Sequence, residues 1–225
     1  MVTELTADVW WLDLTGVNAY LVGGEEVTLV DGGMPWHAGS VREGLSEVGY
    51  DVADVDRVLL THYDLDHVGG LGRLEDLDAP VYVGRNDADF VAGRRRPPLT
   101  NRKSAFQWIT GRFARPPPGP VRAVSDGEEI GQFTAVHTPG HTEGHMAFVS
   151  EQSDVAFVGD LLRNEGNKLQ QTPWFFTRDP GEIPDSVDTL TEVMPPVEVI
   201  AFGHGDPILE NGYRILQEYR EPDTH

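Results

Sequence analysis

The sequence predicts an α/β protein whose β-sheets pack together, with helices on the outside. Both halves of the chain contain short runs of β-prone residues separated by glycine-containing turns. In each half, segments with apolar residues at helical spacing follow these runs. A chain of 225 residues can bury a substantial core without staples. Periodicity alone does not distinguish this arrangement from other α/β layouts.

The first half alternates strands with helices. Strands are expected, in order, at 9–14, 19–22, 27–30, 57–60 and 80–83. A helix is expected at about 38–48, because Val41, Leu45 and Val48 fall on one face. A short helix near 86–92 follows the last of these strands.

The second half repeats this style. Strands are expected at 133–137, 146–149, 155–159 and 199–202. Asp179 as N-cap, Pro180 at the first position and Glu182 three residues after the cap predict the start of a helix. Its apolar stripe consists of Ile183, Val187, Leu190 and Met194. A final helix is expected at about 211–220.

The segment 93–120 has a different texture and is interpreted as an insertion or lid on a single domain spanning 1–225. Proline pairs and triplets bracket Phe106, Trp108, Ile109 and Phe113, whose spacing suits a short amphipathic helix. Residues 85–122 contain nine Lys and Arg against two Asp, a net charge of +7, which leaves −27 for the rest of the chain. Such asymmetry marks a segment with its own role.

Composition excludes several classes of protein. The absence of cysteine rules out disulfides, Cys-ligated zinc and thiol catalysis. No apolar run reaches about 18 residues, so a transmembrane helix is not expected. Residues 1–14 contain acids rather than a basic region and an apolar core, so we expect no signal peptide and a cytoplasmic location. A net charge of −20 with 15 Arg and two Lys is typical of proteins that work in concentrated salt, which predicts a halophilic source.

Histidines and carboxylates gather where strands are predicted to end. The densest cluster, 61–70, contains His62, Asp64, Asp66 and His67, and positions 62, 64 and 66 project to one side of an extended chain. Three later turns carry His141, Asp160 and His204. Imidazole and carboxylate groups on turns are the ligands that a divalent metal ion needs.

These motifs resemble the metallo-β-lactamase superfamily. That family carries His-x-His-x-Asp-His, then a lone His, a bridging Asp and a final His on later loops. The matching positions are His62, Asp66, His67, His141, Asp160 and His204. The resemblance covers roughly residues 9–210. It implies an αββα sandwich, in which two mixed β-sheets lie between outer helices and a metal site lies at the sheet edge.

The resemblance implies two divalent ions, with zinc the first choice. The first would be held by His62, His141, the bridging Asp160, and Asp64 in place of the family's second imidazole. The second would be held by Asp66, His67, His204 and Asp160. The oxygen of Asp64 is a harder ligand, which shifts the preference towards iron or manganese. Alternatively, the shorter Asp64 side chain orients water instead of binding an ion.

Other residues near these loops have two interpretations. Asp31 could hydrogen-bond a liganding histidine or simply shape a turn. The run 174–176 is expected to be buried core rather than a pocket floor, and the arginines 94–96 are expected to form a solvated face.

By resemblance, the leading hypothesis is a metallo-hydrolase acting on a small molecule. A hydroxide bridging the two ions would attack an ester, thioester, lactone or amide carbonyl. Asp66, or Asp64 if it is not fully coordinated, would act as the catalytic proton shuttle. The basic lid suits a substrate with a carboxylate or phosphate. Oligomeric state is left open.

Three alternatives remain at this point. His62, His141 and a carboxylate resemble the facial arrangement of non-haem iron oxidoreductases, as in persulfide dioxygenases; the two-iron flavodiiron type lacks its flavodoxin-like domain here. A nuclease is disfavoured by the −27 body, so neither nucleic acid nor membrane is an expected partner. A binding module with a degenerate site is disfavoured by the nearly complete set of ligands.

Overall fold

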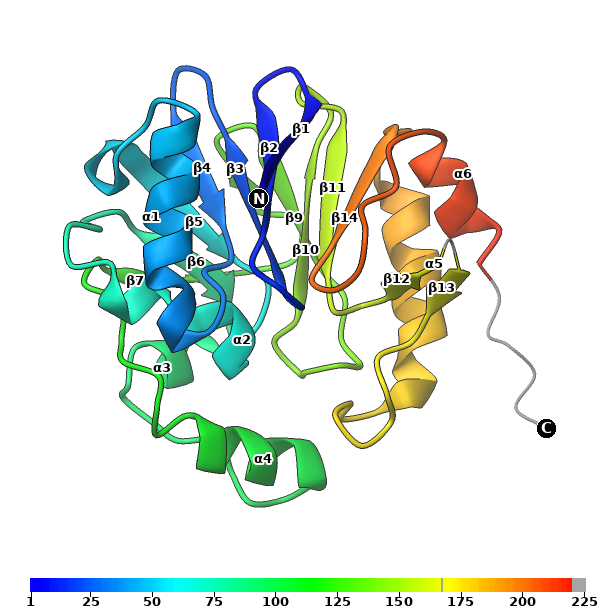
Figure 1. Cartoon of the computed structure of the whole chain (residues 1–225). Helices are drawn as coiled ribbons and strands as arrows, with labels where there is room; N and C mark the ends of the chain where they lie inside the picture. The colour runs from blue at the N-terminus through cyan, green and yellow to red at the C-terminus, as the bar shows by residue number, and fades with distance from the viewer. Residues whose placement is uncertain (167, 220–225) are drawn as a thin grey trace.

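Two β-sheets face each other across an apolar interface, and helices cover their outer faces (Figure 1). The structure is a computed structural model that describes residues 1–166 and 168–219. This arrangement confirms the predicted αββα sandwich of two mixed sheets.

The first sheet has seven strands in sequence order, antiparallel from β1 to β4 and parallel from β4 to β7. These strands are β1 (Val2–Thr6), β2 (Val9–Asp13), β3 (Asn18–Val22), β4 (Val27–Val30), β5 (Val55–Leu60), β6 (Val81–Gly84) and β7 (Val121–Val124). Parallel neighbours end at the same edge of a sheet, so the loops after β4, β5 and β6 meet there.

The second sheet has the order β14-β11-β10-β9-β8, and only the β11–β14 pair is parallel. Its strands are β8 (Glu129–Ile130), β9 (Phe133–His137), β10 (Met146–Ser150), β11 (Val155–Gly159) and β14 (Val199–Phe202). A small hairpin pairs β12 (Arg163–Glu165) with β13 (Lys168–Gln170). All the predicted strands are present, and β1, β7, β8, β12 and β13 are additional.

Helices close the outer layers and cap the loop edge. The α-helices are α1 (Ala38–Glu47), α2 (Leu65–Val68), α3 (Ala88–Val91), α4 (Arg102–Thr110), α5 (Ile183–Val193) and α6 (Gly212–Gln217). Short 3-10 turns occur at η1 (Pro35–His37), η2 (Val52–Asp54), η3 (Leu71–Arg73) and η4 (Pro180–Glu182). Position 220, where the last helix was expected to end, lies outside the described residues. None of the helices among the described residues is long and apolar enough to cross a membrane.

Side-chain alternation explains how the strands contribute to three apolar cores, one between the two sheets and one on the outer side of each sheet. Tyr20 on β3 faces inwards and contacts Phe157 of β11 with ring centroids 5.3 Å apart, whereas its neighbour Leu21 packs outwards in the cluster that contains Leu45 of α1. Phe148 on β10 likewise faces the other sheet. Because successive strand residues point to opposite faces, one apolar strand serves two cores.

The helix α4 buries polar side chains, whereas the sequence indicated only that the helix would be amphipathic. A helix forms within 93–120 as predicted, but its polar residues Lys103, Ser104 and Gln107 are buried, while Phe106 and Ile109 are exposed. Helical periodicity identifies two contrasting faces without saying which one meets the protein. The buried polar face of α4 therefore has partners inside the molecule.

Candidate metal centre

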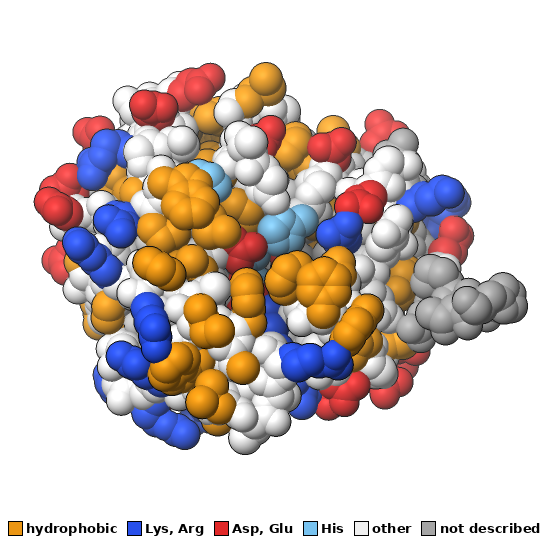
Figure 2. All heavy atoms as spheres, turned by 60° about the horizontal axis from the view of Figure 1, so that its bottom comes forward, with side chains coloured by type: hydrophobic (Ala, Val, Ile, Leu, Met, Phe, Trp, Pro, Cys, Tyr) orange, Lys and Arg blue, Asp and Glu red, His pale blue; other side chains and the backbone are white. Residues whose placement is uncertain are grey.

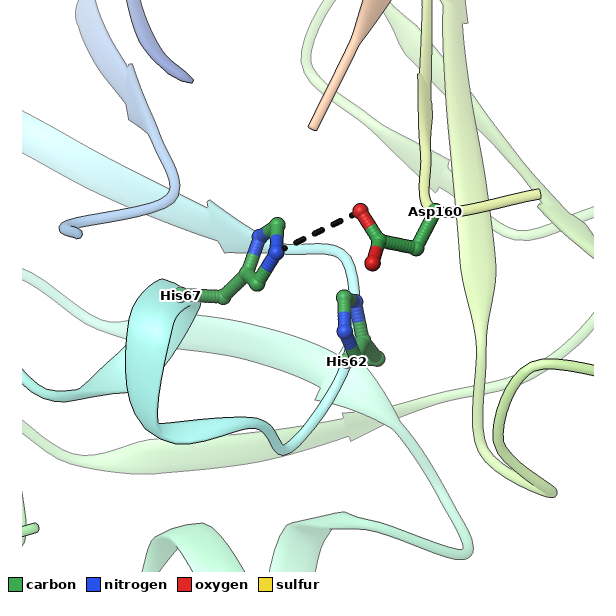
Figure 3. A group of neighbouring side chains, drawn as sticks. All are labelled: His62, His67 and Asp160. Carbon is green, nitrogen blue, oxygen red and sulfur yellow. Dashed lines mark ion pairs between the residues drawn. The ribbon is translucent and has the colours of Figure 1, made fainter. Parts of the chain in front are cut away.

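All seven side chains singled out as ligands come together at one edge of the sandwich. His62 and Asp64 follow β5, Asp66 and His67 lie on α2, and the other three follow β9, β11 and β14. The two sheets meet the same edge, so residues far apart in sequence become neighbours. Figure 3 shows His67 on the short helix pointing towards Asp160, with His62 beside both.

One subset surrounds Asp160 from the side of α2. The Nε2 atom of His67 lies 3.4 Å from Asp160 Oδ1, and the Nε2 atom of His204 lies 3.4 Å from Asp160 Oδ2. The Nε2 atom of His204 is also 3.4 Å from Asp66 Oδ2. Ligand atoms about 2.0–2.1 Å from a tetrahedral ion lie about 3.3–3.4 Å apart, so these spacings fit a single ion.

A second subset lies on the other side of Asp160. The Oδ2 atom of Asp64 lies 3.1 Å from His141 Nε2 and 3.5 Å from His62 Nε2. The Nε2 atom of His141 is 3.5 Å from Asp160 Oδ2. Groups in both subsets are therefore close enough to hold metal ions.

Unpaired buried atoms support metal binding. Among the described residues, Nε2 of His62, Nε2 of His67 and Oδ1 of Asp160 have no hydrogen-bond partner. A buried polar atom without a partner carries a desolvation cost of roughly 1–3 kcal/mol. A divalent ion accepts lone pairs of this kind, so the donor set fits the ion that the sequence predicted.

Asp31 fixes the orientation of His67. Its Oδ2 atom accepts from Nδ1 of His67 and from the Thr61 hydroxyl, each at 2.8 Å, and its Oδ1 atom accepts from the Thr61 N–H at 2.9 Å. Of the two interpretations of Asp31, the structure shows the hydrogen bond to the histidine. Nε2 of His67 is thereby left free to face the cluster.

The loops that carry Asp160 and His204 are held by buried polar contacts. The N–H of Asp160 donates to Nε2 of His145 at 3.1 Å. Nδ2 of Asn18 donates to the carbonyls of Phe202 and Gly205 at 3.0 and 2.7 Å. Position 203 has no room for a larger residue than glycine, because a Cβ there would lie 2.2 Å from Oδ1 of Asp160. The cluster is therefore rigidly positioned by its surroundings.

Charges within the cluster shift its titration. The Asp160 carboxylate outweighs burial and raises the pKa of His204 to about 10. Burial alone would raise the pKa of Asp160, but the charges of His204, His67 and His141 hold it well below its usual range. Without an ion, protons on His67 and His204, whose pKa values Asp160 raises, balance the carboxylates, and a bound cation would replace those protons.

A sequence model of the metallo-β-lactamase superfamily matches residues 12–204. The chain belongs to this superfamily. The uncharacterised protein YobT of Bacillus subtilis (strain 168) is 30% identical over 93% of each chain. An atrochrysone carboxyl ACP thioesterase of Aspergillus novofumigatus is 32% identical over 68% of this chain, but this match spans only 40% of the thioesterase.

Solved structures show the same superfamily fold. A metallo-β-lactamase family protein from Thermus thermophilus superposes with a TM-score of 0.71 and 29% identity, covering 96% of this chain and 79% of that one. The superfamily consists largely of hydrolases that carry a metal-binding His and Asp cluster. The hydrolase class and the capacity for divalent metal ions therefore extend to this member.

This member of the superfamily has a buried lysine in its cluster, which the sequence analysis missed. Nζ of Lys103 on α4 forms an ion pair with Oδ2 of Asp64 and lies 2.9 Å from Nε2 of His141. One turn later, Gln107 donates to Oδ1 of Asp64 at 2.9 Å and to the Tyr63 carbonyl at 2.6 Å. The available signal was the four-residue spacing of two polar side chains on one face of the predicted helix.

Lys103 also changes the electrostatics around it. Burial and the charge of Lys103 lower the pKa of His141 to about 4. Although burial favours the neutral acid, Lys103, His141 and His62 hold the pKa of Asp64 well below its usual range. Asp64 is therefore ionised, and both of its oxygens have donors from α4.

A cavity of about 270 Å³ opens over the cluster. Its apolar wall includes Met34, Leu65, Phe106, Pro173 and Phe176, and its floor includes Asp66, Asp160 and His204. Figure 2 shows hydrophobic side chains gathered around the histidines and carboxylates on this face.

The aromatic run 174–176 lies beside this cavity, and its last residue, Phe176, forms part of the apolar wall. The expectation that it is buried core is wrong: Trp174 is 58% exposed and Phe176 37% exposed. Phe106 of α4 contacts Phe176 with ring centroids 5.3 Å apart. The helix α4 and the run 174–176 therefore meet at the cavity.

Proposed function

We propose that this chain hydrolyses an ester or thioester of a small molecule that carries an apolar group. The observation that carries this proposal is the apolar cavity whose floor is the carboxylate and imidazole cluster. An apolar wall binds the non-reacting part of a substrate, while a few polar groups at the floor orient the reacting part. The likeness to a thioesterase supports this bond class. Lactones and amides share the same carbonyl chemistry and form part of the test.

Asp66, His67, Asp160 and His204 would hold a divalent ion. When bound, such an ion lowers the pKa of water towards about 7 and polarises a carbonyl oxygen. Zinc suits two imidazoles with two carboxylates. Iron or manganese would be favoured by an oxygen from Asp64, but donors from α4 already occupy both oxygens of that residue.

Asp66 is the residue we assign to proton transfer. Its carboxylate lines the cavity, and its side chain is 27% exposed, so it can reach both water and substrate. Burial would raise the pKa of Asp66, but the hydrogen bond from His204 and the charge of His67 lower it, so the group is ionised and can accept a proton. Asp64, engaged by Lys103 and Gln107, is not assigned this step.

The segment around α4 would act as a lid that selects the substrate. Its Phe106 forms part of the cavity wall over the cluster. A separate hollow of about 310 Å³ is lined by Arg85 and Arg95 of the basic region 85–122 and by Arg178. We therefore propose that the group next to the scissile bond is apolar, and that any anionic group of the substrate extends towards this second hollow.

The test is a hydrolysis assay on p-nitrophenyl esters and acyl thioesters of two to ten carbons, with lactones and amides in parallel. Activity should disappear after chelation, return with zinc, and fall at least about 10³-fold in Asp160→Asn. Asp188→Asn, exposed on α5, is the matched control and should retain activity. Consumption of oxygen with a persulfide by iron-loaded protein, and no hydrolysis by any metal form, would contradict the proposal.

A further inference from the structure

We propose that the Lys103 side chain fills the first metal position, so that this chain binds one ion where the family resemblance implies two. The proposal deepens the hydrolase function and rests on it only for the ion held beside Asp66, His67, Asp160 and His204. It concerns the opposite side of Asp160, where Asp64, His62 and His141 meet.

The lysine contacts two of the three ligand atoms that Asp64, His62 and His141 would offer an ion. Its Nζ pairs with Oδ2 of Asp64 and lies 2.9 Å from Nε2 of His141, and those two acceptor atoms are 3.1 Å apart. Lysine offers donors only, so Nε2 of His141 must present its lone pair to the amine. An imidazole nitrogen has one lone pair in the ring plane. Nε2 of His141 therefore binds either Lys103 or a metal ion, and in this structure it faces Lys103.

The charge at this position is already balanced. Lys103 is 2% exposed, and a buried cation needs a partner to offset its loss of hydration. Asp64 supplies that partner and is itself buried. A divalent ion placed beside the same carboxylate would face a like charge in a region of low dielectric constant. Binding there would require Lys103 to leave.

The arrangement is supported by other residues of α4 as well as by the Lys103 side chain. Asn101 caps the helix by accepting from the Ser104 N–H at 2.8 Å. One turn further on, buried Gln107 bonds both Oδ1 of Asp64 and the Tyr63 carbonyl. Two residues on one helix face thus engage the two oxygens of one carboxylate. The helix thus fixes Lys103 beside Asp64 and His141.

Lys103 is therefore a positioning residue that takes the place of an ion. It does not line the cavity that holds Asp66 and His204, but approaches Asp64 from the neighbouring hollow. Its hydrogen bonds and its ion pair go to Asp64 and His141, which lie outside the set that would hold the other ion. The position beside Asp66, His67, Asp160 and His204 can therefore bind one ion. The position beside Asp64 and His141 is occupied by Lys103.

The experiment counts ions per chain. Metal-free full-length protein is titrated with zinc and with cobalt, and bound metal is measured by elemental analysis and native mass spectrometry. We expect one ion in the unaltered protein, and its loss in His204→Ala. Lys103→Met and Lys103→Ala should bind a second ion, seen in the cobalt form as additional d–d absorption.

Lys168→Met provides the matched control, because Lys168 is the other lysine of the chain and is exposed. This variant should still bind one ion. Two ions in the unaltered protein would overturn the proposal, as would one ion in folded Lys103→Met and Lys103→Ala. If both of these variants fail to fold, the count in the unaltered protein decides the matter.

The outcome is separable from the proposed function. One ion per chain without hydrolysis of any substrate would sustain this proposal and contradict the hydrolase. Two ions together with hydrolysis would do the reverse. The readout is metal content, so it does not depend on knowing the substrate.

Discussion

Oδ2 of Asp31 lies 2.8 Å from Nδ1 of His67, on the opposite edge of the imidazole from the Nε2 atom that faces Asp160. The carboxylate accepts a hydrogen bond from Nδ1–H, so in the neutral ring that would bind an ion the lone pair of His67 is on Nε2, which faces the cluster. Asp31 directly follows β4, and its backbone has a φ of 57°. One residue outside the metal cluster thus decides which nitrogen of His67 can bind an ion.

Replacing Asp31 should weaken metal binding without removing a ligand. Asp31→Asn loses the negative charge that stabilises the Nδ1 proton of His67, and such partners are worth about 10–100-fold in metal affinity. Competition titration with a chromogenic chelator measures the loss. Asp188→Asn, exposed on α5, is the control. Equal zinc affinity in Asp31→Asn and the unaltered protein would show that the hydrogen bond does not orient His67.

Asp87 should make the stability of the metal-free protein depend on pH. Burial raises its pKa to about 6, partly offset by the hydrogen bond that its Oδ2 accepts from the Tyr63 N–H at 2.9 Å. The folded state thus binds a proton more tightly than the unfolded state. This contribution to the free energy of unfolding is greatest below about pH 4 and is lost as the pH rises through about 6, by roughly 3 kcal/mol at most.

Asp87→Asn keeps an acceptor for Tyr63 and removes the titration. Relative to the unaltered protein, we expect this variant to gain stability as the pH rises from about 4.5 to about 7.5, the range in which the carboxyl group loses its proton. Urea unfolding of metal-free protein at several pH values measures the difference. A difference in stability that stays constant over this range would mean that Asp87 titrates normally in the folded chain.

The aromatic rim should select for long apolar acyl groups. Phe106→Ser and Phe176→Ser each remove a ring from the cavity wall, and each ring is worth on the order of 1–2 kcal/mol for an acyl chain packed against it. We expect KM to rise about 10-fold for eight-carbon esters and to change little for acetates, with kcat nearly constant. Phe113→Ser removes an exposed ring outside the wall and serves as control. A uniform loss on both ester lengths would point to a structural effect instead.

Thermal stability should rise with potassium chloride. Outside residues 85–122 the chain carries a net −27, and salt screens the repulsion among these charges. We expect Tm to increase by several degrees between about 0.1 and 2 M KCl. Sucrose at matched osmolality separates screening from general exclusion of cosolute. A Tm that stays flat or falls with KCl would contradict the proposed adaptation to salt.

The sequence was most informative where local chemistry decides structure. The run 155–159 is buried throughout because its strand lies between two cores, and the predicted bounds of 133–137 and 155–159 agree with β9 and β11. The turns after them carry His141 and Asp160, so the cluster followed from the strands.

The contribution of α4 depends on contacts that no local pattern encodes. Lys103 meets Asp64 across 39 positions of sequence, and the solvated face expected for the arginines 94–96, which are exposed, gives no sign of this contact. Phe106 satisfied the rule for an amphipathic helix, yet it faces a cavity rather than a core. The exposure of Trp174 and Phe176 was not predicted for the same reason, since an apolar cavity rim and an apolar interior have the same composition.

The four residues assigned to one ion come from both sheets. Asp66 and His67 follow β5 of the first sheet, whereas Asp160 and His204 follow β11 and β14 of the second. In a chain without cysteine, an ion bound there would be a removable cross-link between the two layers, closing loops of the kind that disulfides close elsewhere. Resistance to unfolding and to proteolysis would then follow the supply of metal, and the lifetime of the protein would report whether its ion is in place.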